Sequence, residues 1–227
     1  MPTALVTGAG RGIGLATARA FVELGWRVFA LDKQFGNELG GERVEYDLTG
    51  LDGIPKLVGS LGPIDTLVNN AGVLYCDPYD AIPEAHAAEI LTVNLRAPVA
   101  LIEAVAPQMR KRKSGRIVNV GSVAAFTGHP DLWCGATKAA LLNVTKSYAS
   151  QLGKDGVLVN TVAPGPTLTA MYEQLPQSRR DGVMKSVHAG RACSPEEVAR
   201  VIVWLGTSSP EYVSGSTVDV NSGSYPR

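Results

Sequence analysis

Four glycines fall within residues 7–14, directly after an apolar run at the start of the chain. Glycine allows a backbone to turn sharply and to approach a ligand closely. Where such a turn leads from a strand into a helix, backbone N–H groups and the helix dipole can hold a pyrophosphate. The strict Gly-x-Gly-x-x-Gly pattern fails because Ile13 occupies its last position, yet the spacing still predicts a dinucleotide-binding turn. Its expected cofactor-binding residues are Gly8, Gly10, Arg11, Gly12, Ile13 and Gly14.

An acid, Asp32, ends the second apolar run, about 20 residues beyond the turn. A carboxylate there is placed to bond both hydroxyls of the adenosine ribose and to repel a 2′-phosphate, which favours NAD. Arg11 and Lys33 argue for NADP, because either cation could balance that phosphate. Asp47, which ends the third predicted strand, and its neighbour Leu48 are expected beside the adenine. The other interpretation of Asp47 is a turn or helix-cap residue.

Strands and helices that could position these groups alternate along the whole chain. Short β-branched or apolar runs predict strands at 3–6, 27–32, 43–46, 65–69, 116–120, 157–162 and 217–220. Helical patterns fill the gaps at 13–24, 51–61, 84–94, 97–111, 133–152 and 195–206. Such alternation predicts right-handed β-α-β units around a parallel sheet with helices on both faces. The expected fold is a single-domain, doubly wound, Rossmann-like α/β structure over 1–227.

Composition favours a soluble protein that binds a small ligand. Of 227 residues, 45% are hydrophobic and 19% charged, and 21 basic residues balance 21 acidic ones. No net field therefore attracts nucleic acid or an anionic membrane. The one basic run, 110–113, is expected to end a helix, where cations complement the dipole. The three cysteines are widely spaced and the three histidines lack ligand spacing, which predicts reduced thiols and no metal site.

The sequence also gives expectations for location and for one segment over the site. The amino-terminal residues lead directly into an apolar strand without a leader pattern, and no apolar run approaches the length of a membrane span. A cytoplasmic location without membrane contact is expected. Residues 168–190 are the least patterned stretch. They are a candidate mobile lid over the site, or a simple surface excursion.

Further motifs give the chain a family resemblance. Together with the turn and Asp32, the Asn-Asn-Ala-Gly sequence at 69–72 and Lys138 make it resemble the short-chain dehydrogenase/reductase family over essentially its whole length. The family's Thr-Gly-x3-Gly-x-Gly pattern matches residues 7–14, and its carboxyl-terminal pattern matches 215–223 loosely. The resemblance implies a seven-stranded parallel sheet of order 3-2-1-4-5-6-7. It adds as cofactor-binding residues Asn70, Ala71, Gly72, Lys138, Pro164, Gly165 and Thr167, the last near the nicotinamide carboxamide.

The resemblance also implies a catalytic set of asparagine, serine, tyrosine and lysine. Asn94 matches the asparagine, which supports a proton-relay water, and Ser122 matches the serine that holds the carbonyl. Lys138 matches the lysine that binds the nicotinamide ribose and lowers the pKa of the tyrosine. The tyrosine itself is missing, because Cys134 stands four residues before Lys138.

Cys134 is expected to weaken proton transfer because its side chain is shorter than that of tyrosine. A thiol has a pKa near 8.5 against about 10 for a phenol, and a neighbouring lysine is expected to lower the pKa of Cys134 further. The sulfur, however, lies closer to its backbone than a tyrosine oxygen does, and a thiol is a weak hydrogen-bond donor. Loss of a positioned general acid costs about 10²- to 10⁴-fold in rate. The chain is therefore expected to be a slow dehydrogenase at best.

Three interpretations of Cys134 stay open. It is a tyrosine-to-cysteine change in a working enzyme, since the codons differ by one base. Alternatively, turnover continues with the proton moving through water held by Asn94 and Lys138, through Cys134 itself, or through Tyr75. The non-catalytic interpretation of Tyr75 is a half-buried aromatic residue on a loop. The third interpretation is a protein that binds a dinucleotide without turnover, in a sensing or structural role.

The expected reaction is reversible hydride transfer between a secondary alcohol and a ketone or 3-oxoacyl group. An epimerase or isomerase on the same fold is less favoured, because sugar-nucleotide enzymes of the family carry a larger carboxyl-terminal region.

The substrate loops are expected at 73–82, 124–133 and 168–190, and His129 either touches substrate or is a solvated loop residue. Apolar faces at 97–109 and 139–152 suggest a homo-oligomer, a dimer or tetramer. An apolar part of the substrate is suggested by Val123, Phe126, Leu132, Trp133, Leu168 and Met171.

Overall fold

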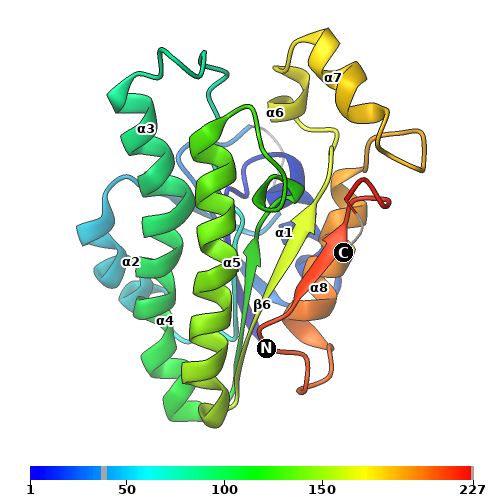
Figure 1. Cartoon of the computed structure of the whole chain (residues 1–227). Helices are drawn as coiled ribbons and strands as arrows, with labels where there is room; N and C mark the ends of the chain where they lie inside the picture. The colour runs from blue at the N-terminus through cyan, green and yellow to red at the C-terminus, as the bar shows by residue number, and fades with distance from the viewer. Residues whose placement is uncertain (37–39, 226–227) are drawn as a thin grey trace.

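A seven-stranded parallel sheet forms the centre of the molecule (Figure 1). The computed structural model describes residues 1–36 and 40–225. The strand order is β3-β2-β1-β4-β5-β6-β7, as the family resemblance implies, so that prediction is confirmed. The strands are β1 (Thr3–Thr7), β2 (Arg27–Asp32), β3 (Glu42–Glu45), β4 (Thr66–Asn69), β5 (Gly115–Val120), β6 (Val157–Pro164) and β7 (Thr217–Val220).

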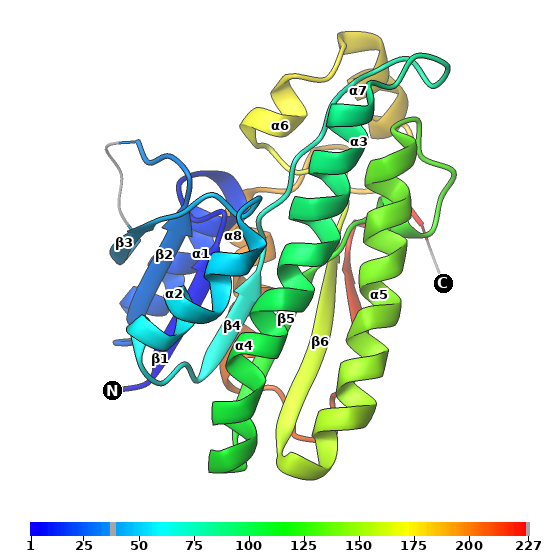
Figure 2. The same cartoon turned by 90° about the vertical axis from the view of Figure 1, so that its left-hand side faces the viewer.

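Helices cover both faces of the sheet. The helices α1 (Gly12–Glu23) and α8 (Pro195–Thr207) pack on one face, and α2 (Ile54–Leu61), α4 (Ala97–Arg112) and α5 (Leu132–Leu152) lie on the other (Figures 1 and 2). Helix α3 (Glu84–Leu91) leads into α4 along the same column. The doubly wound prediction is therefore confirmed, with boundary differences of one or two residues at most elements.

Alternation along the buried strands produces two separate apolar cores. In β1, Leu5 faces the α2, α4 and α5 side, where it lies in register with Phe29 of β2 and Leu67 of β4. Its neighbours Ala4 and Val6 face the α1 and α8 side. All three β1 residues are fully buried, because a parallel sheet with helices on both faces exposes neither face to water.

Local sequence signals explain where several helices begin and end. Ser194 and Glu197 form a reciprocal capping box at the start of α8, at 3.3 Å and 2.8 Å. The basic run at 110–113 ends α4 as predicted, with Arg110 bonded to Asp155 at 2.7 Å and Lys113 in a left-handed conformation at φ 54°. These cations therefore stabilise a helix end within the fold.

The connection between α3 and α4 differs from the predicted break. A π-helical turn, Thr92–Arg96, joins them into a continuous helix from Glu84 to Arg112. By length and composition alone this helix could cross a membrane, with a mean hydropathy of 1.4 over its apolar window. Half of that window is buried inside the protein, as in a core helix of a globular fold. The sequence expectation concerned an uninterrupted apolar run, and charged residues such as Glu89, Arg96 and Glu103 interrupt this helix.

Residues 168–190 contain two helices that the sequence does not predict. Helix α6 (Ala170–Glu173) is capped by Thr169, and α7 (Gln177–Met184) follows Pro176. Helix α6 spans a single turn, and α7 is polar around most of its circumference, so neither carries a strong 3.6-residue apolar repeat. Both helices stand above the carboxyl ends of the strands (Figure 2). We refer to residues 168–190 as the α6–α7 segment.

Candidate active site

A cavity of about 550 Å³ opens at the carboxyl ends of the parallel strands, where doubly wound folds bind their ligands. Its walls come from the glycine turn, the loops after β2 to β6, helix α5 and the α6–α7 segment. Gly10 and Gly14 belong to the turn but are not among the described residues that line the cavity. The sequence-predicted residues that do are Gly8, Arg11, Gly12, Ile13, Asp32, Asp47, Leu48, Asn70, Ala71, Gly72, Asn94, Ser122, Cys134, Lys138, Pro164, Gly165 and Thr167.

The glycine turn is packed so tightly that side chains are excluded from it. A Cβ atom on Gly14 would lie 2.0 Å from the carbonyl oxygen of Gly8, and one on Gly10 would lie 2.3 Å from that of Gln34. Gly8 has φ +64° and Gly12 has φ +54°, in the left-handed region. The cradle therefore requires glycine for its shape, and its open side, at the start of α1, fits the pyrophosphate of a dinucleotide.

Asn70 and Thr7 fasten the turn to the neighbouring strand β4. The Thr7 hydroxyl accepts hydrogen bonds from the backbone N–H groups of Asn70 and Ala71, both at 3.0 Å. The side-chain amide of Asn70 donates in return to the carbonyl oxygens of Thr7, at 2.9 Å, and Gly8, at 3.2 Å. The Asn-Asn-Ala-Gly motif thus supports the turn directly, in addition to lining the cavity.

Asp32 contacts the turn as well as the cavity. Its Oδ2 accepts a hydrogen bond from the Gly10 N–H at 2.9 Å, and its Oδ1 accepts one from Gln34 at 3.3 Å. Lys33, an argument for a 2′-phosphate, lies 3.9 Å from the Glu89 carboxylate, which offsets its charge. Arg11 lines the cavity. Asp32 thus lines the cavity at the carboxyl end of β2 while it also supports the turn.

Asp47 is a turn residue that also lines the cavity. It lines the cavity, and its Oδ1 accepts hydrogen bonds from the N–H and hydroxyl of Thr49, both at 2.9 Å. Those two bonds lower the pKa of Asp47. The residue is a turn-stabilising acid whose position also faces the cavity.

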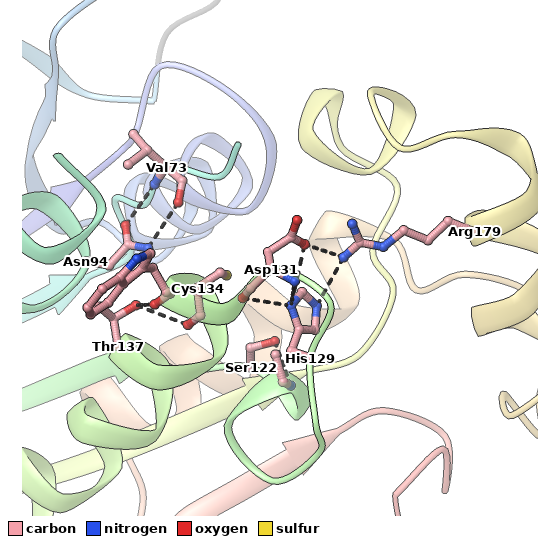
Figure 3. Close-up of polar contacts among 10 residues, drawn as sticks. Val73, Asn94, Ser122, His129, Asp131, Cys134, Thr137 and Arg179 are labelled. Carbon is pink, nitrogen blue, oxygen red and sulfur yellow. Dashed lines mark hydrogen bonds and ion pairs between the residues drawn. The ribbon is translucent and has the colours of Figure 1, made fainter. Parts of the chain in front are cut away.

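Asn94 lies in the π-helical turn and fixes the loop after β4. Its Oδ1 accepts a hydrogen bond from the Val73 N–H at 2.8 Å, and its Nδ2 donates to the Val73 carbonyl at 3.0 Å (Figure 3). The side chain is buried. The extra residue of a π turn, which often marks a functional site, directs this amide at the backbone beside Gly72.

Ser122 and Lys138 approach the cavity from two different elements. Ser122 follows β5, and its Oγ accepts a hydrogen bond from the Ala124 N–H at 3.1 Å. Lys138 is buried on α5, and its ammonium donates to the Val120 carbonyl at 2.7 Å. Burial lowers the pKa of Lys138. Lys138 is therefore a buried cavity residue rather than a solvated surface lysine.

Cys134 lies one helical turn before Lys138 and on the same face of α5, so both line the cavity. Burial raises the pKa of the Cys134 thiol, and this effect outweighs the opposing influence of the Lys138 ammonium. The expectation that lysine would make this thiol more acidic is thus wrong in net direction, because it neglected desolvation. At neutral pH the group is a protonated thiol.

A charged cluster that the sequence did not predict surrounds this thiol. Asp131, immediately before α5, accepts a hydrogen bond from Nη2 of Arg179 on α7. The same Nη2 lies 3.4 Å from Nε2 of His129 (Figure 3). Only 5% of the Asp131 side chain and 19% of the Arg179 side chain are exposed. His129 was a candidate substrate contact, but Arg179 lies 48 residues from Asp131, and no local pattern connects them.

The Tyr75 side chain contacts Glu89 and His86 rather than the cavity. Its hydroxyl donates to the Glu89 carboxylate at 2.6 Å, and its ring stacks on His86 with centroids 3.7 Å apart. That hydrogen bond raises the pKa of Tyr75. Within residues 1–36 and 40–225, Tyr75 is not one of the side chains that line the cavity. The arrangement argues against Tyr75 as a relocated proton donor.

Comparison with known proteins decides the family. Residues 2–180 match the family model described as short chain dehydrogenase. The chain belongs to the short-chain dehydrogenase family. Among its relatives, a 3-oxoacyl-[acyl-carrier-protein] reductase from Vibrio harveyi is 35% identical over 98% of this chain and 96% of its own length. An acetoacetyl-CoA reductase from Rhizobium meliloti is 32% identical over 98% of both chains.

Solved structures of other family members share the fold. A 3-oxoacyl-[acyl-carrier protein] reductase from Brucella melitensis superposes with a TM-score of 0.91 at 32% identity, covering 100% of this chain and 92% of its own. A Beutenbergia cavernae protein, provisionally assigned as an NAD(P)-dependent gluconate 5-dehydrogenase, contains NADP at low occupancy. It gives a TM-score of 0.93 at 32% identity, covering 98% and 96%. The chain is thus a short-chain dehydrogenase enzyme of the oxidoreductase class with a Rossmann-like fold.

Proposed function

We propose that this short-chain dehydrogenase interconverts a secondary alcohol and a ketone or 3-oxoacyl group, with NAD(H) as the preferred cofactor. The observation that carries the proposal is one cavity that joins the glycine turn and Asp32 to Ser122 and Lys138. When bound, the nicotinamide supplies or accepts the hydride, and the protein supplies orientation and electrostatics. The tightly packed glycine cradle described above supports this cofactor class.

Each side chain has a role that follows from its chemistry. The Ser122 hydroxyl donates a hydrogen bond to the substrate carbonyl oxygen and so polarises it. Lys138, fixed through the Val120 carbonyl, directs its remaining N–H donors at the nicotinamide ribose. Asp32 accepts hydrogen bonds from the adenosine ribose while it holds the turn through Gly10.

The substrate class is supported by relatives and by the cavity wall. Two relatives are named for the reduction of 3-oxoacyl and acetoacetyl groups. The substrate side of the cavity carries apolar side chains, which favours a substrate with an apolar part. These side chains are Val123, Met171, Leu175 and Val183.

Turnover is expected to be slow because Cys134 stands at the proton-transfer position. A protonated thiol is a weak donor, and its raised pKa disfavours the thiolate. The same observation favours a second candidate function, in which the protein binds a dinucleotide without turnover. Both functions share the cofactor end of the cavity and differ only in the fate of the proton.

Two further properties belong to the proposal. We propose a homo-oligomer built through α4 and α5, which lie side by side (Figures 1 and 2). These helices carry the half-buried Ala104, Val144 and Tyr148. Sedimentation velocity would measure the size of the oligomer, and a monomer at micromolar concentration would contradict it.

A cytoplasmic setting is proposed because Cys76, Cys134 and Cys193 are free thiols.

The proposed function is tested by separating binding from turnover. NADH binding is followed by fluorescence titration, and NADH oxidation is measured over a panel of ketones and 3-oxoacyl thioesters. Binding together with slow turnover supports the dehydrogenase. Binding with no turnover on any substrate favours the second candidate, and no binding of either NADH or NADPH would contradict both.

Asp32→Asn is expected to relax the preference for NADH over NADPH. The amide keeps an oxygen for the Gly10 N–H but removes the charge that repels a 2′-phosphate. A repulsion of about 1.4 kcal/mol corresponds to about tenfold in relative affinity. The ratio of the NADPH and NADH dissociation constants should therefore fall by about tenfold. An equal fall in Asp47→Asn would contradict the assignment of this discrimination to Asp32.

A further inference from the structure

The substrate side of the cavity offers few groups that exchange a proton near neutral pH. Among the described residues that line it, Lys138 is bonded to the Val120 carbonyl, Arg179 is paired with Asp131, and Glu89 accepts the Tyr75 hydroxyl. Cys134 is a protonated thiol. His129 and Tyr172 are the remaining acid or base side chains there.

His129 lies on the segment that connects the two reacting positions, Ser122 and Cys134. Its side chain packs on the first turn of α5, because a Cβ atom on Gly135 would lie 3.0 Å from the His129 Cβ. The ring is largely buried, with 22% of the side chain exposed, and lines the same cavity. Figure 3 shows it between Ser122 and Asp131. Tyr172 belongs to α6, outside this segment.

Contacts on both nitrogens set the orientation and charge of the His129 ring. Nδ1 accepts a hydrogen bond from the Asp131 N–H at 3.2 Å, and it lies 3.3 Å from the backbone oxygen of Asp131 and 3.5 Å from its carboxylate. Nε2 faces Nη2 of Arg179 at 3.4 Å, which is longer than an ordinary hydrogen bond. The Arg179 guanidinium only donates, so its approach favours a lone pair on Nε2, whereas the Asp131 N–H favours a lone pair on Nδ1. The ring is a neutral base with Nε2 on the side of the cavity-lining Arg179.

We propose that His129 transfers the proton that position 134 cannot, with Asp131 as the residue that positions its ring. The inference rests on the proposed dehydrogenase function. A histidine base oriented by a carboxylate is suited to this role, because imidazole gains and loses protons near neutral pH. His129 is then a catalytic residue, and Asp131 a positioning residue.

The proposed step conserves atoms and electrons. In alcohol oxidation, the substrate O–H bond breaks and its proton bonds to Nε2 of His129, while the carbonyl π bond forms. The hydrogen on the carbinol carbon would leave with both electrons of its C–H bond, and an oxidised nicotinamide, when bound, would accept it. When Nε2 takes up the proton, its long contact with Arg179 breaks, and Arg179 keeps its ion pair with Asp131. The proton then passes to solvent, and reduction follows the same steps in reverse.

The charges around His129 predict its pH dependence. Burial lowers its pKa below the ordinary value of 6.5, and Arg179 acts in the same direction. Asp131 opposes them. The thiol of Cys134 and the ammonium of Lys138 complete the titratable groups on the adjoining face of α5. The base form therefore dominates at neutral pH, and alcohol oxidation should fall about tenfold per pH unit below the pKa of His129.

The test is a double-mutant cycle between positions 129 and 134. His129→Asn is expected to lower kcat/KM by about 10²-fold in the natural background. In the Cys134→Tyr background the phenol carries the proton, so the same substitution should cost less than about tenfold. His86→Asn is the matched control, because His86 stacks on Tyr75 outside the cavity. Its kcat/KM should stay within about twofold of the natural chain.

Two measurements without turnover accompany the cycle. The NADH dissociation constant of His129→Asn should stay within about twofold of the natural value, which shows that the cofactor end is intact. An NMR titration of the imidazole should place the pKa of His129 below 6.5 and match the acid limb of the rate profile. A rate profile whose acid limb persists in His129→Asn would overturn the proposal.

The remaining outcomes separate this inference from the proposed function. Turnover that survives His129→Asn, or that is lost in Tyr172→Phe instead, overturns the role of His129 and leaves the dehydrogenase intact. An equal loss in both backgrounds makes His129 a substrate contact and likewise overturns the role. If the natural chain shows no turnover and Cys134→Tyr does, the proton-transfer role of His129 is also overturned. Absence of turnover in both the natural chain and Cys134→Tyr, with NADH bound, overturns the proposed function itself.

Discussion

Cys134→Tyr is expected to raise kcat/KM for ketone reduction by about 10²-fold or more. Cys134 lines the cavity one turn before Lys138, so a tyrosine there would place a phenol beside a buried ammonium. That cation would lower the pKa of the phenol and make it a better acid. A phenolic hydroxyl also reaches further than the thiol and donates a stronger hydrogen bond. Steady-state rates of NADH oxidation over the ketone and 3-oxoacyl panel measure the gain.

The matched control for this substitution is Cys134→Phe. Phenylalanine fills the same space as tyrosine but has no hydroxyl, so it should give no gain in rate. An equal gain in both variants would attribute the effect to packing and would contradict a proton-transfer role for position 134. The NADH dissociation constant should be similar in all three proteins, because the glycine turn and Asp32 are unchanged.

Gly14→Ala is expected to weaken NADH binding by about 10²-fold or more and to lower the free energy of unfolding by about 1–3 kcal/mol. The new methyl group would lie 2.0 Å from the Gly8 carbonyl oxygen and 2.5 Å from the Asn70 amide. The former contact involves backbone, so the turn itself must move. Fluorescence titration and urea denaturation measure the two effects.

Gly59→Ala provides the opposite case on the same chain. Gly59 lies in α2, where a Cβ atom would meet nothing within 4 Å. Alanine there should raise the free energy of unfolding by about 0.5–1 kcal/mol, because it restricts the unfolded chain and favours the helix. NADH binding should not change. If Gly14→Ala bound NADH as tightly as Gly59→Ala, the turn would not be the cofactor cradle.

The sheet could be predicted because its signals are local. Alternating apolar runs located the strands, and the family resemblance supplied their order. The glycine turn and Asp32 were found from spacing alone, since each follows directly from a strand end. The structure then adds what spacing cannot give, such as the hydrogen bond from the Gly10 N–H to Asp32.

The missed features depend on contacts between distant parts of the chain. Arg179 could not be linked to Asp131, because α7 has a polar sequence and no apolar repeat that would place it over α5. The direction of the Cys134 pKa was wrong because the sequence displays the nearby lysine but not the burial of the thiol. The sequence also predicted a break between two helices at the place where the π-helical turn at Asn94 joins them.

The reciprocal bonds between Thr7 and Asn70 bear on the thermodynamics of ligand binding. Together with the bonds from Asn70 to Gly8 and from Ala71 to Thr7, they make four hydrogen bonds. These bonds hold the carboxyl ends of β1 and β4 together before any ligand binds. A preorganised cradle loses little conformational entropy on association. Calorimetric titration should therefore show NADH binding without the large unfavourable entropy of coupled folding, and Asn70→Ala should introduce that entropic cost.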